Sequence, residues 1–182
     1  FKNVARGNAA ISFNLNASEA MENFTFTNNV IDGVTGGNYS GLVLRASKGR
    51  VVISGNDIKN VVWNAVQLLN STADTLTITD NKFASGADEG ILNLYGVTAT
   101  TLTIKENQFL VAENQPGVCY IESADVSLNY WGGEAPANLP EGVIYTNYYT
   151  IYDAETGALG GLTEVKVAVA KIGDTPYATV LE

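Results

Sequence analysis

Short runs in which apolar and polar residues alternate recur along much of the chain. Residues 76–83 read apolar, polar, apolar, two turn residues, Asn, polar and apolar, and residues 102–109 repeat that order. Two earlier copies, residues 24–31 and 51–58, fit the same template. Alternation with a period of two predicts strands that are buried on one face.

One asparagine in each copy marks the period of the repeat. Asn29, Asn56, Asn81 and Asn107 recur about every 26 residues, a period typical of a solenoid, in which each repeat buries its apolar face only against its neighbours. Asn tolerates the left-handed backbone of a sharp corner, and its amide can bond to the Asn one coil away. We therefore expect these four asparagines to form a structural ladder.

A second alternating segment lies between the copies, at residues 41–44, 65–68, 91–94 and 118–121. Three short strands per repeat and no helical stretch predict an all-β, parallel β-helix of about five coils. The phase of the alternation predicts which side chains stack in inward columns. These are Leu44/Leu68/Leu94/Ile121, Leu42/Val66/Leu92/Cys119, Phe24/Val51/Leu76/Leu102/Val126, Phe26/Ile53/Ile78/Ile104/Leu128 and Ile31/Ile58/Phe83/Phe109.

The repeat breaks in the segment 124–133. We expect Tyr130 and Trp131 to form an aromatic cap over the open apolar end, and residues 143–152 to pack back along the helix. Residues 1–152 then make one domain, a parallel β-helix with its cap and return segment. Residues 153–182, which include two adjacent glycines, are expected to be a linker and the truncated start of a following module.

Composition narrows the function classes. Ten Lys and Arg against nineteen Asp and Glu give a net charge of −9, which disfavours nucleic acid as a partner. No apolar run is long enough to predict a membrane span in this chain. One cysteine and no histidine exclude an internal disulfide, a catalytic imidazole and a His-ligated metal.

The repeat, its asparagines and the ending Asn129-Tyr130-Trp131-Gly132-Gly133 resemble right-handed parallel β-helix repeat domains of the pectate-lyase-like superfold, found in large bacterial surface proteins. The resemblance implies a right-handed helix, an extracellular or cell-surface location and further modules of the same polypeptide. Residues 169–179 look like the lead-in strand of such a module. Because this fold serves lyases, hydrolases, tailspikes and adhesins, it does not select one function.

The favoured hypothesis is a non-catalytic module for adhesion, display or glycan contact, without a cofactor. No acid, base and metal constellation converges in the sequence. Tyr95, Tyr120, Tyr148 and Tyr149 are candidate ligand-binding residues, because aromatic faces suit the apolar sides of a sugar ring. The partner would be a polysaccharide or a host-surface glycan.

The alternative is a polysaccharide-degrading enzyme, either a lyase or a glycoside hydrolase. Lyases of this fold use Ca²⁺, for which Asp80, Asp88, Glu89 and Glu106 are candidate ligands. Hydrolases of this fold pair carboxylates from adjacent coils, and Asp80 and Glu106 occupy equivalent template positions. These two residues are thus the candidate catalytic pair, and Ca²⁺ enters only under the lyase alternative.

Overall fold

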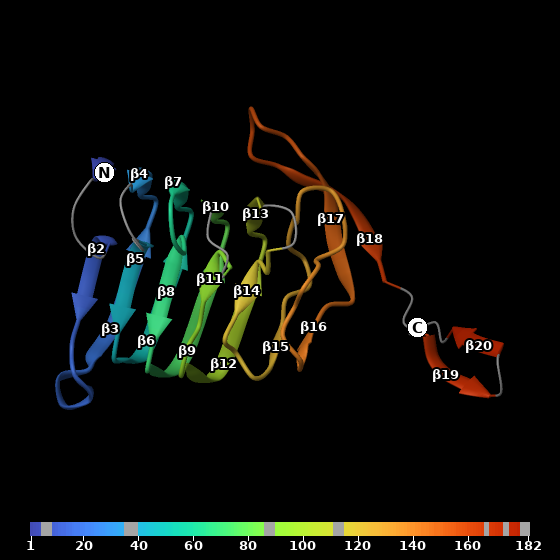
Figure 1. Cartoon of the computed structure of the whole chain (residues 1–182), viewed down its shortest axis with the longest axis horizontal. Coiled ribbons are helices and arrows are strands. Elements are labelled where there is room, and N and C mark those ends of the chain that lie inside the picture. Colours follow the sequence, from blue (N-terminus) through green and yellow to red (C-terminus); the bar gives the residue numbers. More distant parts are fainter. Residues whose placement is uncertain are drawn as a thin grey trace.

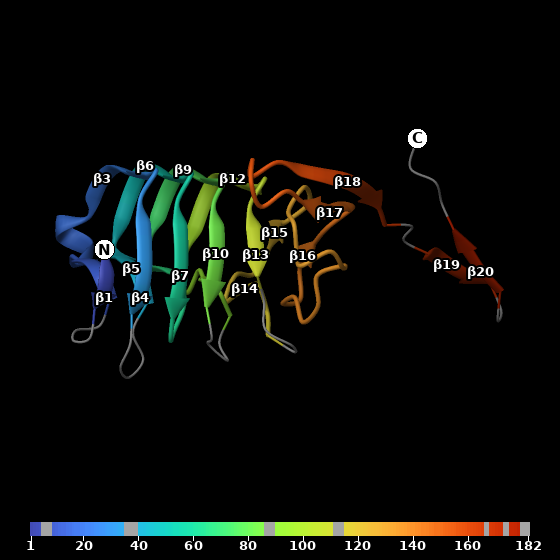
Figure 2. The same ribbon diagram turned by 90° about the horizontal axis from the view of Figure 1, so that it is seen from above.

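In the computed structural model, the described residues are 1–4, 9–34, 40–85, 90–110, 115–165, 168–172 and 175–178. They form strands joined by turns, with one short 3-10 helix, η1 (Ala17–Glu19), among them. Strands of successive coils lie side by side along the long axis of the molecule (Figure 1). The view from above shows the same progression from β1 to β13 (Figure 2).

Three parallel sheets form the walls of the stack. The first sheet contains β3 (Met21–Thr27), β6 (Ser47–Ser54), β9 (Thr72–Thr79) and β12 (Thr98–Lys105). The second contains β2 (Ala9–Asn14), β5 (Ser40–Arg45), β8 (Val66–Leu69), β11 (Leu92–Asn93) and β14 (Val118–Cys119). The third contains β1 (Lys2–Val4), β4 (Val30–Val34), β7 (Asp57–Val61), β10 (Lys82–Ser85) and β13 (Gln108–Leu110).

Each turn of the chain contributes one strand to each sheet, which confirms a parallel β-solenoid with three strands per coil. The four strands of the first sheet are separated by three turns. The complete part of the solenoid therefore extends over about three turns, fewer than the five coils expected from the sequence.

The inward columns of the central coils are in the predicted register. Leu76 lies opposite Val51 on one side and Leu102 on the other, and Ile78 lies between Ile53 and Ile104. In the third sheet, Phe83 lies between Ile58 and Phe109. Most of these side chains are almost completely buried. Each coil therefore covers the apolar face of the next, as the repeat predicted.

The register predicted for the last coil of the second sheet is wrong by one residue. Leu92 lies opposite Val118, whereas Cys119 lies opposite Asn93. Cys119 is buried, and its thiol donates to the carbonyl of Leu92 at 3.6 Å. The strand is short because Tyr120 adopts the left-handed backbone, with φ of 58°, and turns the chain into the next corner.

The register predicted for residues 124–129 is wrong by two residues. The Asn129 amide donates to the carbonyl of Ile104, as the Asn81 amide donates to that of Ile53. Asn129 therefore occupies the equivalent position one coil later, which aligns Val126 with Ile104 and not with Leu102. The prediction fails here because Asn129 follows Asn107 at a shorter interval than the one that separates the earlier asparagines.

The asparagines form a continuous ladder of side-chain amides. Asn56 Nδ2 donates to Asn81 Oδ1 at 2.9 Å, and Asn81 Nδ2 donates to Asn107 Oδ1 at 2.9 Å. Asn29 begins the ladder, and Asn129 ends it by accepting from Asn107 at 3.0 Å. Each accepting Oδ1 also receives the backbone N–H of the preceding asparagine. The buried amides are therefore satisfied by one another and by backbone carbonyls.

The left-handed residue at this corner is the one before each ladder asparagine, and not the asparagine itself. These corner residues are Asn28, Gly55, Asp80, Glu106 and Leu128, all with φ between 56° and 67°. The preference of Asn for that conformation therefore explains only Asn28. The ladder asparagines recur because of their hydrogen bonds.

The segment after Trp131 extends the stack and does not return along it. β15 (Ala124–Asp125) pairs in parallel with β16 (Val143–Ile144), and Tyr130 bridges Gln108 on one side and Tyr149 on the other. The chain was expected to fold back over the side of the helix. A parallel addition is favoured because it pairs the backbone edge that residues 124–130 would otherwise expose.

An antiparallel hairpin follows, made of β17 (Asn147–Tyr152) and β18 (Leu159–Glu164). Part of the predicted linker therefore belongs to this hairpin. β19 (Ala168–Ile172) and β20 (Thr175–Ala178) pair with each other, apart from the stack (Figure 1). The predicted lead-in strand at 169–179 lies partly outside the described residues.

Replacing Asn81 by Ala is expected to lower the free energy of unfolding by roughly 2 to 4 kcal/mol, because the change leaves several buried polar groups without partners. Asn29→Ala is the matched control. It should cost less, because Asn29 is half-buried at the end of the ladder. Urea unfolding followed by circular dichroism measures both. Equal losses for the two variants would contradict a buried ladder as the source of stability.

Candidate functional site

Two hollows hold most of the side chains that the sequence singled out. The first, which we call the corner cavity, has a volume of about 320 Å³ and lies where the asparagine corner meets the β17–β18 hairpin. The second, the tyrosine groove, has a volume of about 680 Å³ and lies beside the corner between the second and first sheets. Residues lining the corner cavity are Asp80, Asn81, Lys82, Glu106, Gln108, Tyr149, Tyr152, Gly157 and Leu159.

Asp80 and Glu106 approach the corner cavity from consecutive coils. Strands β9 and β12 are in register up to Thr79 and Lys105, so the next residues lie one above the other on adjacent coils. The backbones of neighbouring strands are about 4.8 Å apart. Both have left-handed backbones, with φ of 58° and 59°. Asp tolerates that conformation, whereas Glu is disfavoured in it, and such strain often gathers at functional sites. The preceding coil has Gly55 at this corner.

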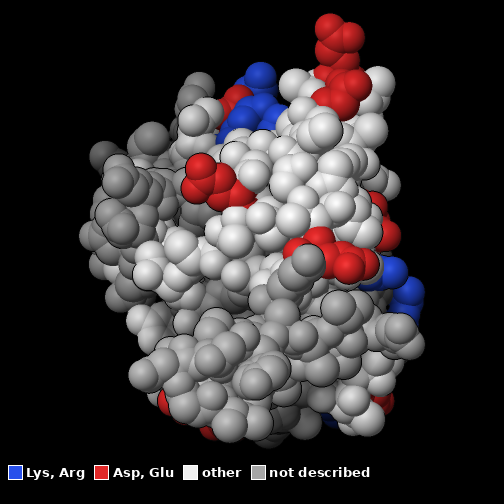
Figure 3. Space-filling view, turned by 90° about the vertical axis from the view of Figure 1, so that its right-hand side faces the viewer, with Lys and Arg blue, Asp and Glu red and all other residues white. Residues whose placement is uncertain are grey.

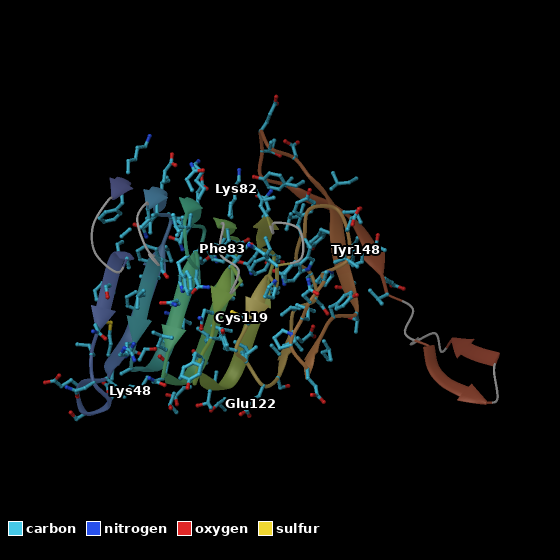
Figure 4. The ribbon with its side chains drawn as sticks, viewed as in Figure 1. Lys48, Lys82, Phe83, Cys119, Glu122 and Tyr148 are labelled. Atoms are coloured by element: carbon cyan, nitrogen blue, oxygen red, sulfur yellow. The ribbon has the colours of Figure 1, made fainter. Side chains whose placement is uncertain are left out.

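Lys82 and Gln108 come from the next strands of the same coils, where they face each other in register. Gln108 is 4% exposed, and its side-chain oxygen Oε1 has no hydrogen-bond partner among the described residues. The ammonium of Lys82 lies 5.4 Å from the centre of the Tyr152 ring. Figure 4 shows Lys82 at the edge of the stack, while Phe83 points into the core.

The β17–β18 hairpin provides the opposite wall of the corner cavity, through Tyr149, Tyr152 and Leu159. Its turn is held by the carboxylate of Asp153, which accepts the backbone N–H groups of Glu155 at 2.8 Å and Thr156 at 3.0 Å. These hydrogen bonds lower the pKa of Asp153, and the one from the Thr156 backbone has the largest effect. The wall of the cavity is therefore tied to an ionised aspartate.

Tyr95 and Tyr120 face each other across consecutive coils at the tyrosine groove. Their ring centres are 6.0 Å apart and the rings meet edge to face at 77°. They remain 58% and 49% exposed. Their polar neighbours in the groove include Asn70, Thr98, Glu122 and Ser123. Figure 4 places Glu122 at the edge of the molecule opposite the one that carries Lys82.

The four tyrosines proposed from the sequence do not form one surface. Tyr149 lines the corner cavity, whereas Tyr148, its neighbour on β17, packs against the core and contacts Tyr145. This division follows from the strand geometry, because successive side chains point to opposite faces. Tyr95 and Tyr120 belong to the other hollow.

Sequence reasoning did not single out Gln108 or the last ladder residue, Asn129. Gln108 follows Asn107 in the repeat as Lys82 follows Asn81, so the template already placed Lys82 and Gln108 at equivalent positions. Asn129 also matched the template, although at a shorter spacing. Asp88 and Glu89, named as Ca²⁺ ligands, lie outside the described residues.

The aromatic residues near the break in the repeat lie next to the last complete coil. The Trp131 ring stacks on Phe109 with centres 4.4 Å apart and an angle of 10° between the rings, and Trp131 is 6% exposed. The Tyr130 ring lies 5.8 Å from that of Tyr152. The contact between Tyr130 and Tyr152 links the solenoid to the hairpin that borders the corner cavity.

The electrostatics of the described surface are mildly acidic. Lys105 lies 4.0 Å from the carboxylate of Glu106, and both are about half exposed, so solvent screens the pair. Separate Asp and Glu side chains are scattered among uncharged residues on the end that carries the hairpin (Figure 3). Across the described ranges, no three His, Cys, Asp or Glu side chains gather closely enough to hold a metal.

No helix within the described part of the chain has the length and apolar character needed to cross a membrane.

No protein-family model matches this chain, and no curated protein and no solved structure shows significant similarity to it. The site must therefore be interpreted from its own geometry.

The β17–β18 hairpin is expected to loosen in acid. Because the pKa of Asp153 is lowered in the folded hairpin, its stabilising contribution is complete above the ordinary Asp value of about 3.9. That contribution is lost as the pH falls through the lowered pKa. Amide hydrogen exchange of residues 147–164 between pH 2 and 5 measures the effect.

The matched variant for this experiment is Asp153→Asn, which keeps an accepting oxygen but removes the titrating group. Its hairpin exchange should lack the acid transition of the wild type once the intrinsic pH dependence of exchange is subtracted. An identical transition in both proteins would assign the loosening to another group.

Proposed function

We propose that this chain is a non-catalytic module of an extracellular or cell-surface protein, in which a β-solenoid displays a glycan-contacting surface. The observation that carries the proposal is the exposed pair of Tyr95 and Tyr120 at the tyrosine groove. Adhesion or display on a cell surface fits such a module. The partner is a polysaccharide or a host-surface glycan, and further modules belong to the same polypeptide.

The chemistry of the tyrosine groove suits a sugar. Each tyrosine offers an apolar face for stacking and a hydroxyl for hydrogen bonding. The volume of about 680 Å³ lies within the range of small-ligand sites, roughly 300 to 1,000 Å³. Asn70, Thr98 and Ser123 bring polar groups to the same hollow, as the hydroxyl-rich edges of a sugar require. A glycan can therefore find both stacking and hydrogen-bonding partners here.

The scaffold is proposed to be a right-handed helix of the pectate-lyase-like superfold, which the repeat resembles. Trp131 is proposed to act with Tyr130 as an aromatic cap. Its support is the close stacking of Trp131 on Phe109, which covers the last aromatic side chain of the third-sheet column. A stack with a covered end presents its outward faces as a rigid display surface.

Tyr95→Ala and Tyr120→Ala are each expected to weaken glycan binding about tenfold or more, because each removes one stacking surface. Binding to a panel of plant and host glycans, followed by calorimetry on those that bind, measures the change. Ile144→Ala is the control, since it removes an exposed apolar side chain that lines neither hollow. Unchanged binding in both groove variants would refute the assignment of this surface.

A polysaccharide-degrading enzyme is the second candidate function. The observation in its favour is that Asp80 and Glu106 line one cavity, together with Lys82. Paired carboxylates are the machinery of glycoside hydrolysis, and a lysine beside carboxylates and Ca²⁺ suits a lyase. Glu106 also forms an exposed ion pair with Lys105, which gives this carboxylate a role that does not require catalysis.

The non-catalytic proposal predicts no new reducing or unsaturated ends when the chain is incubated with polysaccharides, with or without Ca²⁺. The assay uses the glycans that the binding panel identifies, so that a lack of product is not a lack of substrate. Product formation that Asp80→Ala or Glu106→Ala abolishes would establish the enzyme and overturn the proposal. Binding without turnover would support it.

A further inference from the structure

We propose that the tyrosine groove recognises glycans through an N-acetyl group, so that its ligand class is the neutral acetamido sugars. The inference rests on the proposed function, because it takes the ligand of that groove to be a glycan. Its evidence is separate, since it comes from strand β12, which lines the groove, and not from the exposed tyrosine rings.

The groove lies where the last coil is four residues shorter than the coil before it. In the preceding coil, Asn107 follows Leu92 of the second sheet by 15 residues. In the last coil, Asn129 follows Val118, the partner of Leu92, by only 11 residues. Both ends of this interval stay in register with the preceding coil, through the ladder bond of Asn129 and the pairing of Val118. The missing residues, about 13 Å of strand, are therefore those that would cover the start of β12.

The start of β12 has an open backbone edge. β12 is the last strand of the first sheet, while β15 pairs with β16. The Thr98 N–H donates to the Ser71 carbonyl of the preceding coil. Backbone groups of successive strand residues point to opposite sides, so the N–H and the carbonyl of Ala99 are directed to the open edge. Among the described residues, neither group has a backbone hydrogen bond to the following coil.

The shortened coil also leaves two core positions of β12 partly uncovered. Ala73 and Leu76 of β9 are only 4% and 1% exposed, because β12 covers them. Their partners on β12, Ala99 and Leu102, line the groove and are only half-buried. A ligand that covers these two side chains with apolar atoms therefore gains hydrophobic burial.

An acetamido group matches this combination of an open strand edge and an uncovered apolar surface. Its amide carries an N–H donor and a carbonyl acceptor, the groups that the missing strand would have provided, and its methyl suits Ala99 and Leu102. A hydroxyl group in the same place has no methyl and leaves that surface exposed. The sugar ring can stack on Tyr95 or Tyr120. An acidic sugar is disfavoured, because the charged residue that lines the groove is Glu122.

Calorimetry on the full chain with two matched pairs of neutral ligands tests the proposal. One pair is the β-1,4-linked tetramers of N-acetylglucosamine and of glucose, and the other is N-acetyllactosamine and lactose. In at least one pair, the acetamido member is expected to bind at least about tenfold more tightly. The absence of this preference in both pairs would overturn the inference. The proposed function would survive that result if any glycan of the panel binds at the tyrosines, and it would fail as well if none does.

Two variants of β12 locate the recognition of the acetamido group. Ala99→Pro removes the outward N–H, and proline is tolerated on edge strands where the N–H faces solvent. Leu102→Ala removes apolar surface from the groove. Each is expected to lower the affinity ratio between the members of a pair about threefold or more. The melting temperature shows whether each variant folds, and Leu102→Ala keeps the test valid if Ala99→Pro does not. An unchanged ratio in the folded variants would refute the role of β12.

Two controls separate β12 from the tyrosine rings. Tyr120→Ala is expected to weaken both members of a pair by a similar factor, because its ring stacks on either sugar, and Ile144→Ala should change neither affinity. A ratio that falls in Tyr120→Ala but not in the β12 variants would assign the N-acetyl group to the tyrosines and refute the inference. A blocked alanine tetrapeptide that binds as tightly, with the same dependence on Ala99→Pro, would identify a peptide strand as the ligand and refute the sugar class.

Discussion

The in-register stacking of equivalent residues from coil to coil is the constraint on which this structure depends. Each coil is only a few strands of one chain and cannot bury its apolar face alone. A slip of one residue between coils would turn the inward columns outward. The asparagine ladder opposes such a slip, because each Asn is matched to the Asn of the next coil through both its side chain and its backbone N–H. Hydrophobic burial and register are thus stabilised together.

The same register places chemically different side chains at one repeated corner position. The backbone before each ladder asparagine stays left-handed while the side chain changes from none at Gly55 to carboxylates at Asp80 and Glu106. The scaffold therefore places different side chains at one repeated position without altering the fold. Because the following residues, Lys82 and Gln108, are in register too, four polar side chains gather from two coils. Neither coil could assemble this group by itself.

The end of the repeat contributes what the regular coils lack. The solenoid continues into a partial coil through β16 and then changes to an antiparallel hairpin, β17–β18. That change adds a wall of Tyr149, Tyr152 and Leu159 beside the asparagine corner. The regular surface thereby becomes a cavity at one point of its length. The aromatic contact of Tyr130 with Tyr152 joins the two parts.

The sequence by itself determined the all-β solenoid, the three strands per coil and the columns of the central coils, because the alternation within strands and the longer repeat of the template both leave direct traces in residue order. It also marked Asp80 and Glu106 as equivalent. Tertiary structure alone decided the register at Val126, where the coil shortens and the period no longer applies. Val118 follows Leu92 at the same interval as Leu92 follows Val66, so the wrong register there came from the alternation of residues 118–121 and not from a shorter coil. It also decided that Tyr95 and Tyr120 share one hollow while Tyr149 belongs to another. Such groupings depend on where corners turn and which coil ends meet, and these distances in space are not written in the alternation of residues along the chain.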